Sequence, residues 1–268
     1  MECVECGRRW NAVPRTGRPR RYCSRSCQGQ AYRRRRDQGR LNALTRPAPV
    51  DGNSAAAVET AVAMADAEGI ATITLRSVAL RAGVALRTLQ REAGSRDRLV
   101  AAMVQHVLSA SSPPPTRAED PIGTLTQLAE HEWTTYQAHP WLVSVMASTR
   151  PPLVPAVLRT SGAAIEVFIT MGLDSKTALN RYLALSAYVQ GMGLLLTAEH
   201  QESVRPGTSD HAWWSEEIRQ LSRTGETVRH RWLAELADQP QAHAFDANTC
   251  FRDGLHRVIP GLVHPAPA

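Results

Sequence analysis

Residues 54–108 constrain the fold of this chain most, because turn signals divide them into four short segments with apolar side chains at helical spacing. Gly69 follows the first segment, where glycine can adopt the left-handed conformation that often ends a helix. Thr74 precedes the second segment, and its hydroxyl can accept a hydrogen bond from a first-turn amide. Gly83 and Gly94 end the second and third segments. The sequence therefore predicts four consecutive helices, over residues 54–67, 75–82, 85–92 and 96–108.

The two middle helices have the features of a helix-turn-helix unit. Ala79 is small where two helices must cross closely, and Gly83 permits the unusual backbone angles of the turn. Leu89 would anchor the second helix to the core. In such a unit the second helix enters the DNA major groove. These three residues alone also fit an ordinary helical hairpin in an all-α domain.

Three segments resemble the tetracycline-repressor (TetR) family: AMADAEG at 63–69, TLRSVALRAGV at 74–84 and TLQREAGSRDRL at 88–99. The resemblance implies an all-α transcription regulator, usually a repressor, that binds an operator as a homodimer and is released by a small molecule. It implies no enzyme activity. It also implies a DNA-binding domain over 54–108 and a helical ligand-binding and dimerisation domain over 119–263.

The resemblance assigns DNA contacts to the second helix of the unit and to its surroundings. Arg87 is the expected base reader, through a bidentate hydrogen bond to guanine. Arg96 is expected to hold a phosphate where the fourth helix begins. Together the predicted contacts are Thr74, Val84, Ala85, Leu86, Arg87, Thr88, Gln90 and Arg96.

Two positions depart from the family pattern. Gln90 stands where the family usually has an aromatic residue, often tyrosine, that contacts the DNA backbone. Glu92 and Ala93 replace a common histidine-phenylalanine pair. Gln90 can still hydrogen-bond a phosphate or an adenine edge, whereas Glu92 adds negative charge near DNA. These departures bear on operator affinity and operator sequence.

The first fifty residues are strongly basic. They hold 13 arginines against three acidic residues, a net charge of +10, whereas the other 218 residues carry a net charge of −4. A basic arm on a mildly acidic body indicates a polyanionic partner, most often nucleic acid. Beside a helix-turn-helix, we expect Arg33, Arg34, Arg35 and Arg36 to contact DNA phosphates or a narrow minor groove. A solvated run of charge is the alternative.

Four cysteines in two close pairs, Cys3 with Cys6 and Cys23 with Cys27, predict a tetrahedral structural zinc ion. Four thiolates close the coordination shell, so a catalytic zinc is not expected. Disulfides do not suit the reducing cytoplasm, whereas a redox-responsive zinc site and a disordered tail with incidental cysteines remain open. We expect a zinc-stabilised module over 1–37, with a helix from Ser24 to about Asp37, and a linker over 38–53.

The rest of the chain is predicted to be helical, over residues 122–138, 141–148, 154–172, 176–200, 211–238 and 244–263. The sequence allows 211–238 to be one helix or two pieces around Thr224 and Gly225, and it predicts an interruption of the last helix near Pro260 and Gly261. By order, the helices at 176–200 and 245–259 resemble the family's dimer interface. His131 and Gln190 are polar candidates for orienting an effector. Residues from the helices that enclose the family's pocket are the candidate lining, although plain core is the alternative for each: Trp133, Tyr136, Trp141, Met146, Phe168, Met171, Tyr188 and Met192.

Several classes of protein are disfavoured. No apolar run approaches the roughly 18 residues of a membrane span, and the N-terminus lacks the apolar segment of a secretory signal, so a cytoplasmic location is expected. No glycine-rich phosphate loop, GxSxG or HExxH motif is present. The competing hypotheses are a zinc-stabilised protein-interaction module with degenerate DNA binding and a regulator switched by zinc loss on thiol oxidation.

Overall fold

In the computed structural model, the described residues form an all-helical protein, which confirms the predicted fold class. Apart from an isolated bridge between Glu2 and Arg9, no strand pairing occurs among them. None of the described helices combines the length and apolar character needed to cross a membrane. For some helical residues, 35–44 among them, only the backbone is described. The described residues are 2–9, 21–44, 52–117, 119–203, 210–237 and 246–264.

The N-terminal half contains the predicted series of short helices. Its core is shared by α2, η1, α3, α4 and α5, and Ala61, Ile73 and Met103 are fully buried there. The two helices of the helix-turn-helix begin and end within one residue of the predicted positions. The elements are α1 (Arg25–Leu44), α2 (Gly52–Glu68), the 3-10 helix η1 (Ile70–Thr72), α3 (Leu75–Arg81), α4 (Leu86–Glu92) and α5 (Arg96–Ala110).

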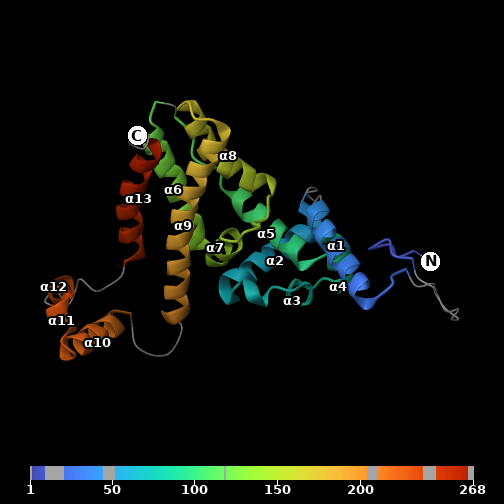
Figure 1. The fold of residues 1–268 in the computed structure, drawn as a ribbon, viewed down its shortest axis with the longest axis horizontal. Helices are drawn as coiled ribbons and strands as arrows, with labels where there is room; N and C mark the ends of the chain where they lie inside the picture. Colours follow the sequence, from blue (N-terminus) through green and yellow to red (C-terminus); the bar gives the residue numbers. More distant parts are fainter. Residues whose placement is uncertain are drawn as a thin grey trace.

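The C-terminal half is a bundle around the long helix α9, which contacts α6, α7, α8 and α13 (Figure 1). The helical stretch predicted at 211–238 forms three short helices that contact one another, with the break that the sequence allows at Gly225 and a second one at His230. The interruption predicted near Pro260 is absent, since the last helix continues through it to Val263. The elements are α6 (Pro121–Ala138), α7 (Pro140–Met146), α8 (Pro155–Thr170), α9 (Ser175–Ser203), α10 (Asp210–Arg223), α11 (Glu226–Arg229), α12 (Arg231–Ala237) and α13 (Ala247–Val263).

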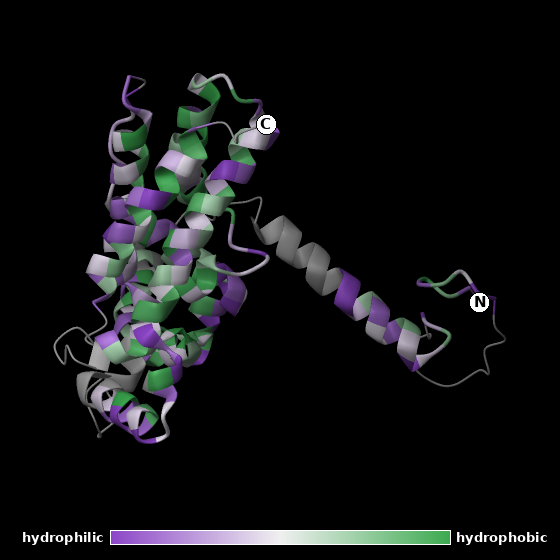
Figure 2. Ribbon diagram, turned by 60° about the vertical axis from the view of Figure 1, so that its left-hand side comes forward, coloured by the Kyte–Doolittle hydropathy of each residue, from purple (hydrophilic) through white to green (hydrophobic). Residues whose placement is uncertain are grey.

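Helix α1 differs from the prediction in length. It continues to Leu44, seven residues beyond the expected end near Asp37, and so occupies the first part of the expected linker. No proline interrupts 38–44, and Pro47 is the first residue that forbids a helix. Residues 45–51 lie outside the described part of the chain. Figure 2 shows the described part of α1, rich in hydrophilic residues, leading away from the helical bundle.

Candidate nucleic-acid interface, cysteine cluster and effector cavity

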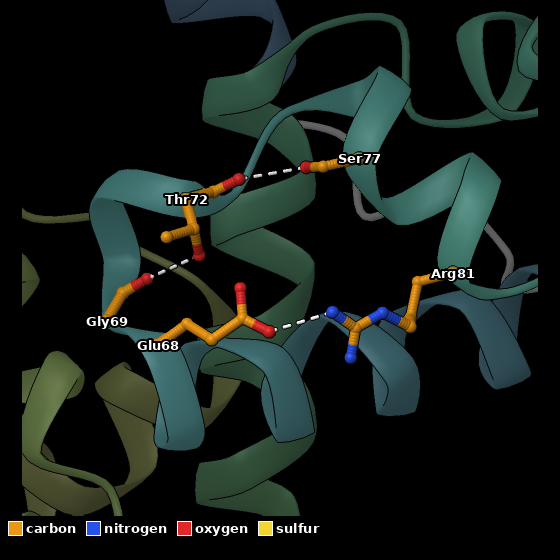
Figure 3. Close-up of polar contacts among 5 residues, drawn as sticks. All are labelled: Glu68, Gly69, Thr72, Ser77 and Arg81. Carbon is orange, nitrogen blue, oxygen red and sulfur yellow. Dashed lines mark hydrogen bonds and ion pairs between the residues drawn. The ribbon is translucent and has the colours of Figure 1, made fainter.

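Helix α3 begins with a complete capping box, which confirms Thr74 as its N-cap. The Ser77 amide donates to Thr74 Oγ1 at 3.0 Å, and the Thr74 amide donates to Ser77 Oγ at 2.9 Å. The Ser77 hydroxyl also donates to the carbonyl oxygen of Thr72 at 2.8 Å, as Figure 3 shows. These bonds satisfy amides that a helix start otherwise leaves without partners. The predicted DNA contact of Thr74 therefore involves a side chain that already caps a helix.

The turn between α3 and α4 has the geometry of a helix-turn-helix. Gly83 has a φ of +67°, a conformation that side chains with a Cβ rarely adopt. The Val84 amide then donates to the Ala79 carbonyl at 3.0 Å, which closes the turn. Ala79 and Leu89 are 4% and 1% exposed, so the close crossing and the core anchor predicted from them are both present.

The residues predicted to face DNA divide into two groups. Arg87 and Gln90 are exposed on α4, Ala85 is exposed at its N-cap, and Thr88 is half-buried. Val84 and Leu86 are half-buried and pack against the core, so they present less surface to a groove. The reason is helical spacing, since Leu86 lies three residues before the buried Leu89 and shares its face.

Arg96 makes contacts that sequence reasoning did not foresee. Its Nε donates to the carbonyl oxygen of Ile73 and its Nη2 to that of Ile70, each at 2.7 Å. The first residue of α5 thereby holds the 3-10 helix that precedes α3. A guanidinium has five N–H donors, so these two bonds leave donors for the predicted phosphate. No sequence motif tells whether an arginine at this position contacts backbone carbonyls or a DNA phosphate.

An ion pair joins the end of α2 to helix α3 of the helix-turn-helix. Arg81 Nη2 lies 2.8 Å from Glu68 Oε1, and Figure 3 shows the two side chains spanning from α3 to the end of α2. In the intervening turn, the Thr72 hydroxyl donates to the Gly69 carbonyl at 2.9 Å. Both side chains of the ion pair are substantially exposed, so this pair adds little to stability. Arg81 is consequently not a free cation for DNA.

The basic run on α1 is partly used within the N-terminal module. Arg34 Nη2 lies 2.9 Å from Glu5 Oε2, and the Glu5 side chain is only 11% exposed. Arg33 is exposed. The side chains of Arg35 and Arg36 lie outside the described residues. Arg34 thus ties α1 to the loop that carries the first cysteine pair.

The four predicted metal ligands lie together. The Sγ atoms of Cys3, Cys6, Cys23 and Cys27 are all within 4.8 Å of one another. Cys23 Sγ is 3.6 Å from Cys6 Sγ and 3.5 Å from Cys27 Sγ. A tetrahedral zinc with Zn–S bonds of about 2.3 Å separates its sulfurs by about 3.8 Å, whereas a disulfide requires about 2.05 Å. The donor set and spacing therefore fit zinc, and all four thiols are free.

Local electrostatics distinguish the cysteines of this cluster. Hydrogen bonds from the backbone, the largest from Cys23, lower the pKa of Cys3 to about 6. The amide of Cys23 lies 3.4 Å from Cys3 Sγ. The neighbouring Cys27 side chain is the main cause that raises the pKa of Cys23 to about 12. A thiolate at Cys3 beside three further sulfurs is the arrangement that a cation would stabilise.

A small cavity of about 50 Å³ lies among α6, α8 and α9. Of the eight predicted lining residues, Tyr136 and Met146 line it, and so does His131. Gln190 is not among the lining residues but donates to Ser186 Oγ at 2.9 Å. The other six predicted residues do not line this cavity and pack in or against the core, which is the alternative that the sequence left open for each: Trp133, Trp141, Phe168, Met171, Tyr188 and Met192.

Specific contacts explain why Trp133, Trp141 and Tyr188 do not line the cavity. Trp133 stacks on Phe251 of α13 with ring centroids 4.5 Å apart. Tyr188 donates to the backbone carbonyl of Phe251 at 2.7 Å. Trp141 Nε1 donates to Asp66 Oδ1 on α2 at 2.7 Å, and His139 Nδ1 lies 2.9 Å from the same oxygen. Aromatic side chains at helical spacing therefore serve here to join helices.

Glu132 is the charged residue among the cavity residues that the sequence did not reveal, since a glutamate on an amphipathic helix ordinarily indicates the solvent face. Its side chain lines the cavity, and Tyr136 donates to its Oε1 at 2.7 Å. Burial raises the pKa of Glu132 to about 7, against the lowering effect of the Tyr136 hydrogen bond. Burial, together with the charge of Glu132, raises the pKa of Tyr182 to about 12.

The sequence is similar to known transcription repressors. A family model described as "Tetracyclin repressor-like, C-terminal domain" matches residues 114–264. The chain is 27% identical over 206 residues to the HTH-type transcriptional repressor DrrR1 of Streptomyces coeruleorubidus, covering 76% of this chain and 75% of that protein.

Two solved structures are similar in fold. Apo ActR from Streptomyces coelicolor has a TM-score of 0.65 at 20% identity, with 80% of this chain and 96% of that chain covered. ActR in complex with actinorhodin has a TM-score of 0.63 at 21% identity, with 77% and 93% covered. Because the family model spans more than half of the sequence, the chain belongs to the TetR family of transcription regulators, which are not enzymes.

Proposed function

We propose that this TetR family transcriptional repressor binds a palindromic operator as a homodimer and leaves it when a small molecule enters the cavity. The observation that carries the proposal is the exposed edge of α4, where Arg87, Gln90 and the N-cap residue Ala85 belong to a helix anchored by the buried Leu89. One such helix reads too few bases for specificity. Two copies related by a two-fold axis would read half-sites about one helical turn apart.

Arg87 is the proposed base reader. Arg87→Ala is expected to weaken operator binding by roughly 1–3 kcal/mol and to relax preference at one position of each half-site, because a bidentate bond to guanine is lost. Selection of a randomised duplex library by each protein, read by sequencing, measures both effects. Arg76→Ala, an exposed arginine on α3, is the matched control. An unchanged base preference in Arg87→Ala would contradict the assignment.

Arg96 is proposed to act on all DNA sequences alike. Arg96→Ala should weaken binding to operator and random duplexes by the same factor, because it removes a phosphate contact and loosens the clamp on Ile70 and Ile73. Titration of both duplexes by fluorescence anisotropy tests this, and circular dichroism reports the accompanying loss of thermal stability. A loss confined to the operator would overturn the proposal.

The cysteine cluster is proposed to hold a structural zinc ion through Cys3, Cys6, Cys23 and Cys27. The support is the separation of the sulfurs and the absence of a disulfide among them. The metal would fix the loop of the first cysteine pair against the start of α1 and so orient the exposed Arg33. Each phosphate that this helix neutralises steepens the salt dependence of binding by about 0.9 in log–log slope.

A short chain of contacts supports release of DNA by an effector. Glu132 and Tyr136 of α6 line the cavity, and the same helix ends at His139, which lies against Asp66 of α2. Trp141 bonds the same carboxylate. A ligand that displaces the end of α6 would therefore move α2, the helix against which α3 and α5 pack. Coupling of this kind needs the ligand to bind one arrangement better than the other.

A further inference from the structure

The cavity holds one carboxylate and no opposing cation. Its lining residues contain neither lysine nor arginine, and Glu132 forms no ion pair within the described part of the chain. The bond from Tyr136 is its one hydrogen bond there, made to Oε1. Each carboxylate oxygen accepts about two hydrogen bonds. Glu132 therefore has unused acceptor capacity directed at a cavity whose walls are mainly apolar.

The position of Glu132 in the cavity wall lowers the free energy of unfolding of the ligand-free protein. The Glu132 carboxylate loses hydration in the cavity wall, and this burial raises its pKa to about 7 although the Tyr136 hydrogen bond opposes the rise. An ionised group without a paired charge costs free energy when it is buried, and a neutral residue of the same shape avoids that cost. A stability cost at a cavity wall is typical of a residue that serves a ligand.

We propose that the effector carries a protonated amine on an aromatic or otherwise apolar body, and that Glu132 accepts the amine. This inference rests on the proposed function, since it specifies the effector class of the same cavity. The Tyr136 hydroxyl orients the carboxylate. The rings of Tyr136 and Tyr182 line the same space and attract a cation through their faces. Thr135, Thr160 and Ser186 add hydroxyl partners along the wall.

The size of the cavity indicates how binding acts on the fold. Its volume of about 50 Å³ has room for a few water molecules, whereas pockets for drug-sized ligands have roughly 300–1,000 Å³. The body of the effector must consequently push α6 away from α8 and α9. Because His139 at the end of α6 and Trp141 of α7 both bond Asp66 of α2, that displacement is transmitted to the DNA-binding half.

Three titratable groups line the cavity beside Glu132, whose own ionisation determines how amine binding depends on pH. They are His131 and Tyr136 on α6 and Tyr182 on α9, while α5, α7 and α8 contribute only apolar residues and Thr160 to the lining. An amine binds the ionised carboxylate, which is the minor form of Glu132 below its folded pKa. Amine affinity is therefore expected to rise as the pH increases from 6 to 8, up to the range where the amine itself loses its proton.

The test compares matched amines and amides on the full-length protein. The probes are a series of arylalkylamines of increasing size, beginning with tryptamine, each paired with its N-acetyl derivative, which has the same body without the charge. Shifts in the thermal unfolding midpoint and calorimetric titration report binding without DNA. We expect at least one amine of the series to bind ten times more tightly than its N-acetyl partner.

Two substitutions on the same helix locate the effect. Glu132→Gln keeps the shape and the acceptor for Tyr136, so it is expected to abolish the preference for the amine while raising the unfolding midpoint at pH 8. Glu130→Gln, at an exposed position two residues earlier, is the control that should keep the preference. A preference that persists in Glu132→Gln, equal binding of amine and amide, or no binding by any amine overturns the proposal.

Failure of the proposed function would be recognised separately. Wild-type protein that binds the amines but retains no sequence-specific DNA would refute the repressor mechanism and leave the amine site standing. Specific DNA binding without amine binding would refute the amine alone.

Discussion

Removal of the metal from the cysteine cluster is expected to unfold residues 2–9 and the beginning of α1 while the helical bundle stays folded. In the described part of this module the buried residues are Cys3, Cys27 and Ala31, which is too little apolar surface for an independent core. A structural zinc supplies folding free energy outright in such modules. We therefore expect one zinc ion per chain in the purified protein.

Two variants make this prediction specific. Cys3→Ser, which removes a buried ligand, is expected to eliminate zinc and to expose 1–37 to limited proteolysis. Cys250→Ser removes an exposed thiol of α13 outside the cluster and should retain one zinc. Metal analysis by mass spectrometry, with proteolytic mapping, checks both. Wild-type protein that is free of metal after purification in zinc-containing buffer would contradict the structural zinc.

Leu89→Ala is expected to destabilise the DNA-binding half by roughly 2–5 kcal/mol, because it leaves a cavity under α4. Leu89 is 1% exposed and lies between α4 and the core formed by α2 and α5. Leu80→Ala is the matched control, since Leu80 on α3 is 84% exposed and its truncation should change stability by less than about 0.5 kcal/mol. Urea denaturation of both variants measures the difference.

The same pair of variants separates stability from DNA reading. Loss of the anchor in Leu89→Ala should weaken operator binding even under conditions where the protein stays folded, because α4 is no longer held in one orientation. Equal stability of Leu89→Ala and Leu80→Ala would show that α4 is not anchored through Leu89.

Local signals in the sequence predicted the DNA-binding half well. Thr74 and Gly83 specify an N-cap and a turn through their own chemistry, and a local rule needs no knowledge of distant residues. Cys3, Cys6, Cys23 and Cys27 were predictable for a related reason, since each pair is close in sequence and one metal geometry brings the pairs together.

The cavity could not be predicted in the same way. Trp133 and Tyr136 are equally plausible lining residues on one helix, and only the position of Phe251, more than a hundred residues later, decides that Trp133 stacks away from the cavity. Glu132 follows the ordinary pattern of a solvent-facing glutamate until α8 and α9 enclose it. The bonds of His139 and Trp141 to Asp66 likewise depend on how the two halves meet.

The measurement that tests the central claim most directly is capture of sheared genomic DNA of the source organism on the purified full-length protein, followed by sequencing. Parallel samples contain a zinc chelator. We predict enrichment of one palindrome whose half-sites lie about one helical turn apart, with weaker enrichment after chelation. Enrichment of no sequence in either sample would contradict the account, and the chain would then act as a zinc-stabilised interaction module that has lost specific DNA binding.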